Sequence, residues 1–518
     1  MRRNISFIPI IALIIAALCL STTSLFAEDE TFTEHDIKAL KACEGVIKLF
    51  QQFQDTVWSG YNLAEIPFIF YMPEKWALLL NYDGEVEGFT SYPSDWPSMG
   101  TEVLFHSGQY RDLVGQLGFY QKVDTVIVVA VPYVNRSIVD LFAFIVHEAF
   151  HEYQFEAFGE IPWAREEKYP IQDSENTAWA YLEMRLLMDA LRSMEADDPA
   201  KCRQYAQQFA AVRQHRWESG DPFIAQYEQG QEINEGTAKY VELKCISLMT
   251  DLHYSSSLKD VATSLLDDFS SISMPDYLLQ IFENRLTGNS ISPEDVPRNR
   301  IYSVGAAQGF LADYFGIDWK SKAQAAGTEF AFVKLMQEEF GWEASESEKL
   351  LKQIKADYNF DQSLKETEEL IDEYTEGFNE ELQTFNRQSG YRIEIEVSRN
   401  GLSRSRSSSA KKWLVDQGTQ ELRSHFNVYV LKNKLLLLDI HDTGILEQNN
   451  WEDSMRKVIF FVQEISSLII DDKHLELSES AQHNFNKMEM SGEKVNLNYS
   501  GSGVIMIDDK EISIQLKP

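Results

Sequence analysis

The chain has 518 residues, of which 44% are hydrophobic and 12% aromatic. This length exceeds one ordinary core and predicts two or three domains, while the apolar content excludes wholesale disorder. The formal net charge of −34 at pH 7 argues against nucleic acid and anionic membrane surfaces as partners.

The first 27 residues have the order of a secretory signal. Arg2 and Arg3 precede an almost unbroken apolar run from Ile5 to Leu20, and a polar stretch then leads to Ala27. We expect cleavage after Ala27 and export to the periplasm or the extracellular space. A retained N-terminal anchor is the alternative. No later segment has the roughly twenty apolar residues that span a bilayer, so no membrane association is expected after cleavage.

Cleavage would leave three cysteines, Cys43, Cys202 and Cys245. They allow one disulfide but no framework of disulfides. No CxxC pair or Cys/His cluster is present, so a cysteine-based structural zinc site is not expected.

The patterns up to about residue 160 predict a mixed α/β region. They give a helix at 35–56, buried strands at 66–71 and 76–80, a loop at 92–100 and one strand at 123–131, stopped by Pro132. Ser137, with Asp140 three residues later, has the pattern of a capping box. It predicts a helix that runs to Phe158, with Gly159 as its stop.

The rest of the chain predicts helices and then strands. Helices are expected at about 173–194, 199–218, 232–250 and 301–315, and helices dominate to about residue 385. Beyond that point the apolar period changes from 3.6 to 2, with clean alternation at 391–397, 426–430 and 512–516, and a hairpin turn at 508–510. Arg404–Ser409 is expected to be a solvated loop. We therefore predict an α+β chain: signal peptide 1–27, main domain 28–385 and a β-rich C-terminal domain 386–518.

The segment His147-Glu148-Ala149-Phe150-His151 carries the chemistry. On a helix, two histidines four residues apart lie on one face, so both imidazoles can reach one metal ion. Glu148 is offset enough to contact a water at that metal without displacing it, as a general base requires. The structural alternative is a pair of core histidines whose polar atoms are satisfied by hydrogen bonds. Two imidazoles and a carboxylate on an otherwise apolar helix would then need compensation without a metal.

A third protein ligand is needed, and the sequence offers three glutamates. Glu235 is followed by the small residue Gly236, which would let a ligand helix approach the helix with the two histidines closely. Glu175 and Glu183 share an apolar stripe on the helix expected at 173–194. Each glutamate has a structural alternative, namely pairing with an arginine such as Arg185, Arg213 or Arg216, or solvation at a helix edge.

Two segments together resemble the gluzincin branch of zincin metallopeptidases: HEAFH and Asn234-Glu235-Gly236-Thr237-Ala238-Lys239-Tyr240. Within that superfamily the chain looks most like secreted bacterial members. The resemblance covers about residues 120–320. It implies a zincin-like catalytic unit, made of an α/β part and a helical part, with His147, His151 and Glu235 as zinc ligands and Glu148 as catalytic base. The spacing departs from the family, because 84 positions separate His151 from Glu235, where many members use roughly twenty. Glu175, only 24 positions on, therefore competes for the third position. No Gly-x-Met-Glu-Asn motif is present, so aminopeptidase action is not implied.

Tyr302 precedes the small residues Gly305, Ala306, Ala307 and Gly309, a helix start that would hold the phenol against the site as an oxyanion donor. Packing as a core aromatic is the alternative. The sequence thus predicts an exported zinc metallopeptidase acting on peptide or protein substrates. Two other functions remain open: a zinc-binding scaffold without turnover whose β-rich domain is a binding module, and a zinc hydrolase of non-peptide amides.

Overall fold

The structure is a computed structural model that describes residues 32–517, except 73–74, 111–118, 124–125, 134, 160–164, 259–267, 273–276, 278, 282, 285–291, 342–343, 453 and 478–479. The expected signal peptide lies outside the described residues. The chain forms two compact units, one of residues 1–152 and 244–273 and the other of residues 153–243 and 274–518. The division falls within two continuous helices, α3 (Ile138–Phe158) and α7 (Thr237–Asp251).

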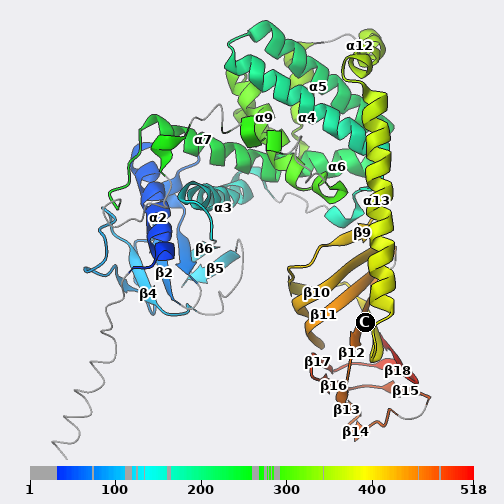
Figure 1. Cartoon of the computed structure of the whole chain (residues 1–518). Coiled ribbons are helices and arrows are strands. Elements are labelled where there is room, and N and C mark those ends of the chain that lie inside the picture. The colour runs from blue at the N-terminus through cyan, green and yellow to red at the C-terminus, as the bar shows by residue number, and fades with distance from the viewer. Residues whose placement is uncertain are drawn as a thin grey trace, which may run out of the picture. The chain divides into compact units, whose positions relative to one another are not determined.

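The first unit is built on a six-stranded sheet with the order β3-β4-β2-β1-β6-β5 (Figure 1). Only β1 and β6 pair in parallel; the other neighbours are antiparallel. The elements are α2 (Glu34–Gln52), β1 (Phe68–Met72), β2 (Trp76–Leu80), β3 (Thr90–Ser91), β4 (Leu104–Ser107), β5 (Phe119–Val123), β6 (Val126–Pro132) and the larger part of α3. The predicted start of the strand at 123–131 was wrong, because Val123 is the last residue of β5 and β6 begins at Val126.

Aromatic contacts join α2 to the sheet and fix α3 within the same unit. Phe50 of α2 meets Phe68 of β1 edge to face, with ring centroids 6.0 Å apart. Gly45 of α2 lets Phe142 of α3 approach, because a Cβ at Gly45 would lie 3.1 Å from the Phe142 ring. On α3, Phe150 contacts the rings of Trp58 and Tyr61. One side of α3 is therefore fixed in the core of the unit.

The second unit joins a bundle of helices to a large sheet. Its helices are α4 (Ser174–Glu195), α5 (Pro199–Ser219), α6 (Pro222–Gln231), the π-helical turn η3 (Glu232–Gly236), the start of α7, α9 (Asn299–Tyr314), α10 (Trp319–Ala326), α11 (Phe332–Phe340), α12 (Ala344–Asp357) and α13 (Phe360–Asn386). Its 13 strands are β7 (Tyr391–Ser398), β8 (Ser403–Ser407), β9 (Trp413–Val415), β10 (Gln420–Lys432), β11 (Leu436–Asn450), β12 (Met455–Val462), β13 (Ile465–Ile470), β14 (Lys473–His474), β15 (Ala481–Phe485), β16 (Met488–Gly492), β17 (Val495–Tyr499), β18 (Gly503–Asp508) and β19 (Glu511–Leu516).

The predicted α+β class is confirmed, and the change from helix to strand falls between Asn386 and Tyr391. Strands β18 and β19 form the expected hairpin, with Asp508 paired to Glu511. Arg404–Ser409 is not a loop, because most of it is strand β8, paired with β10. Two arginines of β8, Arg404 and Arg406, are tied down by ion pairs to buried glutamates. The three cysteines, all in the described part of the chain, are buried and no disulfide joins them.

The sheet of the second unit has apolar residues on both faces. Along β12, Val458 and Phe460 belong to one core, whereas Ile459 and Phe461 belong to another. Alternate side chains of a strand point to opposite faces, so the two cores lie on opposite sides of the sheet. The second core also contains Tyr374, Phe378 and Phe385 of α13, which runs along the sheet in Figure 1.

The turn η3 touches α9 backbone to backbone. A Cβ at Gly236 would lie 2.8 Å from the Cα of Gly305. We expect Gly236→Ala to lower the free energy of unfolding by about 1–3 kcal/mol, because one of the two helical segments must shift. Urea unfolding of the metal-free chain measures this change.

Gly230→Ala is the matched control, since Gly230 lies in α6 of the same unit and nothing lies within 4 Å of the added Cβ. Its stability should stay equal or rise by about 0.5–1 kcal/mol. Equal losses in the two variants would contradict the close contact between η3 and α9.

Candidate metal centre

The two histidines predicted as ligands lie on α3. Its start is fixed as expected: the backbone N–H of Asp140 donates to Ser137 Oγ at 3.1 Å, and Ser137 Oγ donates to the Asp140 carboxylate at 2.9 Å. His147 is buried and His151 half-buried, with ring centroids 4.8 Å apart. The four-residue spacing therefore brings both imidazoles to one place on the helix surface.

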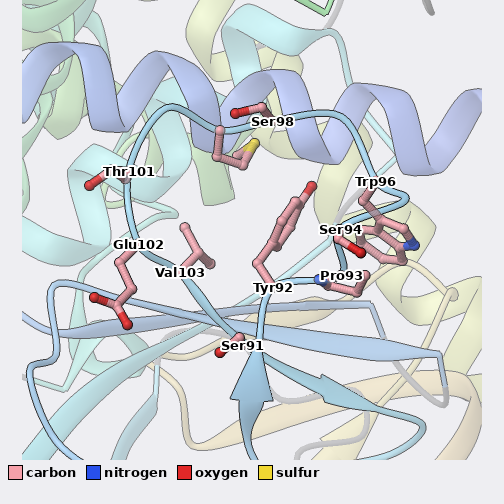
Figure 2. A pocket seen from close by; sticks show the side chains of 10 residues that line it. Ser91, Tyr92, Pro93, Ser94, Trp96, Ser98, Thr101, Glu102 and Val103 are labelled. Carbon is pink, nitrogen blue, oxygen red and sulfur yellow. The ribbon is translucent and has the colours of Figure 1, made fainter.

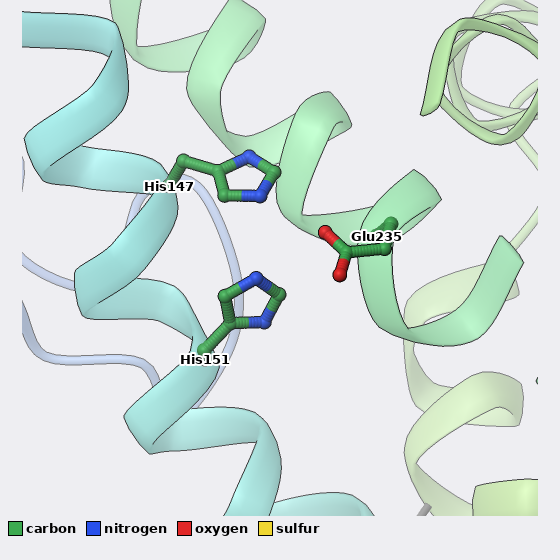
Figure 3. A group of neighbouring side chains, drawn as sticks. All are labelled: His147, His151 and Glu235. Carbon is green, nitrogen blue, oxygen red and sulfur yellow. The ribbon is translucent and has the colours of Figure 1, made fainter. Parts of the chain in front are cut away.

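Glu235 joins these histidines. It lies in η3 and is 8% exposed. One potential ligand atom from each of His147, His151 and Glu235 lies within 4.8 Å of the other two. Figure 3 shows the three side chains directed toward one another. This group can hold a metal ion.

The donor set fits zinc chemically. Two imidazoles and one carboxylate form a known catalytic zinc set that leaves one coordination position open. Ligands at about 2.0–2.1 Å around a tetrahedral ion are roughly 3.3 Å from one another.

The two competing glutamates lie elsewhere. Glu175 is exposed near the start of α4, where its carboxylate accepts a hydrogen bond from Trp179 Nε1 at 3.4 Å. Glu183 is completely buried and paired with arginines: its carboxylate lies 2.8 Å from Arg213 and 2.7 Å from Arg216. The structural alternative weighed for Glu183 is thus confirmed. Neither residue belongs to the group with the two histidines.

Glu183 is part of a buried ionic network that the sequence patterns did not predict. The network contains three arginines and three glutamates from α4, α5, α6, η3 and α9: Glu183, Arg213, Arg216, Glu228, Glu232 and Arg300. Each is at most 3% exposed. Charged residues on otherwise apolar helix faces, such as Arg213 and Glu232, were the signal that could have revealed it.

Electrostatics inside the network favour ion pairs. Burial raises the pKa of Glu183 and Glu228, but the surrounding arginines outweigh it and leave both values below the usual range. Glu228 also accepts a hydrogen bond from Tyr169 at 2.6 Å and one from Trp217 Nε1 at 2.9 Å. For Glu232, burial dominates and raises the pKa although Arg213 opposes it. Glu232 is three residues before Glu235, so the network includes the turn that carries the candidate ligand.

Tyr302 lies on the first turns of α9, half-buried. It is one turn before Gly305, the residue that meets Gly236 of η3, and residues three apart share a helix face. The pKa of Arg298 is raised, mainly by the nearby carboxylate of Glu166. Burial opposes this shift, and Tyr302, Tyr227 and Glu235 add smaller contributions that raise the pKa.

The small residues have a different role from the one predicted. Gly236 was expected to let the helix with the two histidines approach, but it faces Gly305 of α9. The described contact of α3 with η3 is instead polar: Gln154 Nε2 donates to the carbonyl of Asn234 at 2.7 Å. The prediction was wrong because spacing along one segment does not show which neighbour a glycine meets.

A surface pocket of about 350 Å³ lies in the first unit (Figure 2). Tyr92 and Trp96 form aromatic walls, and Met99 and Glu102 also line it. None of the three grouped residues lines this pocket.

The fold and the site define an α+β protein with a candidate His-His-Glu metal site. No family model, no curated protein and no solved structure matches this chain. Among the described residues, no helix has both the length and the apolar character needed to cross a membrane.

The third ligand can be tested by zinc titration of two purified variants. We expect Glu235→Ala to abolish tight zinc binding, because one of three protein donors is lost from the group. Glu175→Ala is the matched control and should bind zinc as the wild type does, since Glu175 is exposed and bonded to Trp179. Loss of zinc from Glu175→Ala but not from Glu235→Ala would reverse the assignment.

Proposed function

We propose that this chain is an exported zinc-dependent metallopeptidase. The observation that carries the proposal is the group of His147, His151 and Glu235, with Glu148 next to His147 on the same helix. A zinc ion held by such a set supplies Lewis acidity, since it lowers the pKa of water to about 7 and polarises a carbonyl.

Glu148 is the proposed general base and then general acid. It is half-buried on α3, between the two histidine ligands in sequence but outside the group of donor atoms. In peptide hydrolysis the water oxygen forms a bond to the carbonyl carbon and its proton passes to Glu148. The C–N bond then breaks, and Glu148 returns the proton to the leaving amine.

Tyr302 is the proposed donor to the oxyanion that forms on the carbonyl oxygen. One observation supports this role: Tyr302 lies one turn before the contact between Gly305 and Gly236. A hydroxyl on a helix packed against η3 is positioned by the scaffold rather than by a loop, as a preorganised donor requires.

Export and substrate class rest on the sequence. The order of charged, apolar and small residues in 1–27 supports secretion, and the resemblance of HEAFH and NEGTAKY to gluzincins supports peptides or proteins as substrates. The strongly negative chain disfavours nucleic acid as a partner.

The central test is Glu148→Gln. We expect this variant to keep zinc and to lose nearly all hydrolysis of a broad peptide library, because a glutamine side chain cannot accept the proton of water. Zinc content and library digestion are measured together. Glu156→Gln is the matched control, an exposed glutamate on the same helix, and should digest as the wild type does.

Three outcomes separate the candidate functions. Activity retained by zinc-loaded Glu148→Gln would remove Glu148 from the mechanism. A wild-type chain that binds zinc but cleaves neither peptides nor small amides would be a scaffold. Cleavage of small amides alone would place the substrate outside peptides.

Tyr302→Phe tests the oxyanion donor. If the hydroxyl acts only in the transition state, kcat should fall on the order of 10²-fold with little change in KM. Tyr314→Phe, at the other end of α9, is the control and should leave both constants unchanged. An unchanged kcat in Tyr302→Phe would return Tyr302 to the role of a packed aromatic.

A further inference from the structure

The candidate ligand Glu235 is held on an unusual piece of backbone. The turn η3 (Glu232–Gly236) is π-helical and lies between α6 and α7. In a π-helix the hydrogen bonds span five residues instead of four, and such turns occur mostly as single turns, often at functional sites. Backbone carbonyls where two hydrogen-bond patterns meet need donors from elsewhere when they are buried.

Gln154 supplies donors to these carbonyls. Its side chain is 1% exposed, and its Nε2 lies 2.7 Å from the carbonyl oxygen of Asn234 and 3.0 Å from that of Ile233. The same nitrogen lies 2.8 Å from Thr237 Oγ1, which itself donates to the Ile233 carbonyl at 2.5 Å. The side-chain amide of Gln154 therefore binds Ile233 and Asn234, the two residues before Glu235, and also Thr237, which follows Gly236.

Gln154 also belongs to the helix of the histidine ligands. It follows His151 by three residues and His147 by seven on α3, spacings that share one helix face. Through Gln154, the face that carries both imidazoles is bonded to the backbone that carries Glu235.

Two further contacts of η3 lead to the helical bundle. Glu232 is paired with Arg213 of α5, and Gly236 lies against Gly305 of α9. These contacts hold the turn to the helical bundle, whereas the hydrogen bonds from Gln154 join it to α3.

We propose that Gln154 is a positioning residue for the metal site: it holds η3 so that Glu235 lies within ligand distance of His147 and His151. The inference rests on the metal site of the proposed function and not on peptide hydrolysis. A ligand held in place by a neighbour binds metal more tightly, and loss of such a partner costs about 10–100-fold in metal affinity.

The test is Gln154→Met in the full chain, a change that keeps the length of the side chain and removes both N–H donors. Zinc affinity is measured by competition with a chromophoric chelator, and the visible spectrum of the cobalt-substituted protein reports ligand geometry. We expect zinc affinity to fall about 10–100-fold and the cobalt bands to shift.

Gln208→Met is the matched control. Gln208 is a glutamine on α5, 5% exposed, and the same substitution should leave zinc affinity and the cobalt spectrum as in the wild type. Wild-type affinity and spectrum in Gln154→Met would overturn the proposal. Equal losses in Gln154→Met and Gln208→Met would also overturn it, because any buried glutamine would then have the same effect.

Thr237→Val is a milder second variant, needed if Gln154→Met does not fold. It removes one of the three acceptors of Gln154 and leaves the two carbonyl contacts. We expect zinc affinity to fall roughly 3–10-fold, at the lower end of the effect of such partners; unchanged affinity would count against the proposal.

The same measurements separate this proposal from the proposed function. A wild-type chain that binds zinc without cleaving any amide removes the peptidase assignment, while the affinities of the variants still decide the role of Gln154. A wild-type chain without zinc affinity removes both.

Discussion

Three arginines and three glutamates are buried together among α4, α5, α6, η3 and α9, and the helical core of the second unit can close only because their charges compensate. Removing one partner of a buried ion pair leaves an unpaired charge in a poorly solvating interior, at a cost of about 3–5 kcal/mol. Arg216 illustrates the constraint, since it contacts Glu183, Glu228 and the side-chain oxygen of Asn176 at once. Few rearrangements of these helices would keep every charge paired, so the network fixes where η3 lies within the bundle.

The turn η3 carries two glutamates with different environments. Glu232 is part of the ionic network, whereas Glu235, three residues later, is grouped with the histidines. In an α-helix, residues three apart point to nearly the same side. A π-helical turn rotates less per residue, so the two carboxylates diverge further. Because the backbone of η3 is π-helical, Glu232 can pair with Arg213 in the core while Glu235 lies in the candidate metal site.

The sequence predicted those parts of the site that follow from local spacing. The helix with His147 and His151 and its capping residue Ser137 came from patterns within one short segment, whereas Glu235 came from the resemblance of NEGTAKY to gluzincins. The contacts that place η3 were not predictable in this way. The contact of Gly236 with Gly305 joins residues 69 positions apart, and Gln154 reaches a carbonyl 80 positions along the chain. Periodicity identifies an apolar face but not its partner. Strand β8 has no apolar face at all, and its arginines pair with Glu447 and Glu421, which are distant in sequence.

Contacts within the second unit also join the C-terminal sheet to the helices of that unit. Glu166 binds Lys412, which directly precedes β9, at 3.0 Å and Arg298, the residue before α9, at 3.4 Å. The apolar core under α13 continues into β10, β11 and β12. The domain boundary at 385/386 stays a prediction, but separation there would expose apolar residues of both α13 and the sheet and would remove a cation that holds Glu166. The β-rich region therefore packs against the helices of its own unit and supplies a cation to Glu166, while none of the three grouped residues comes from it.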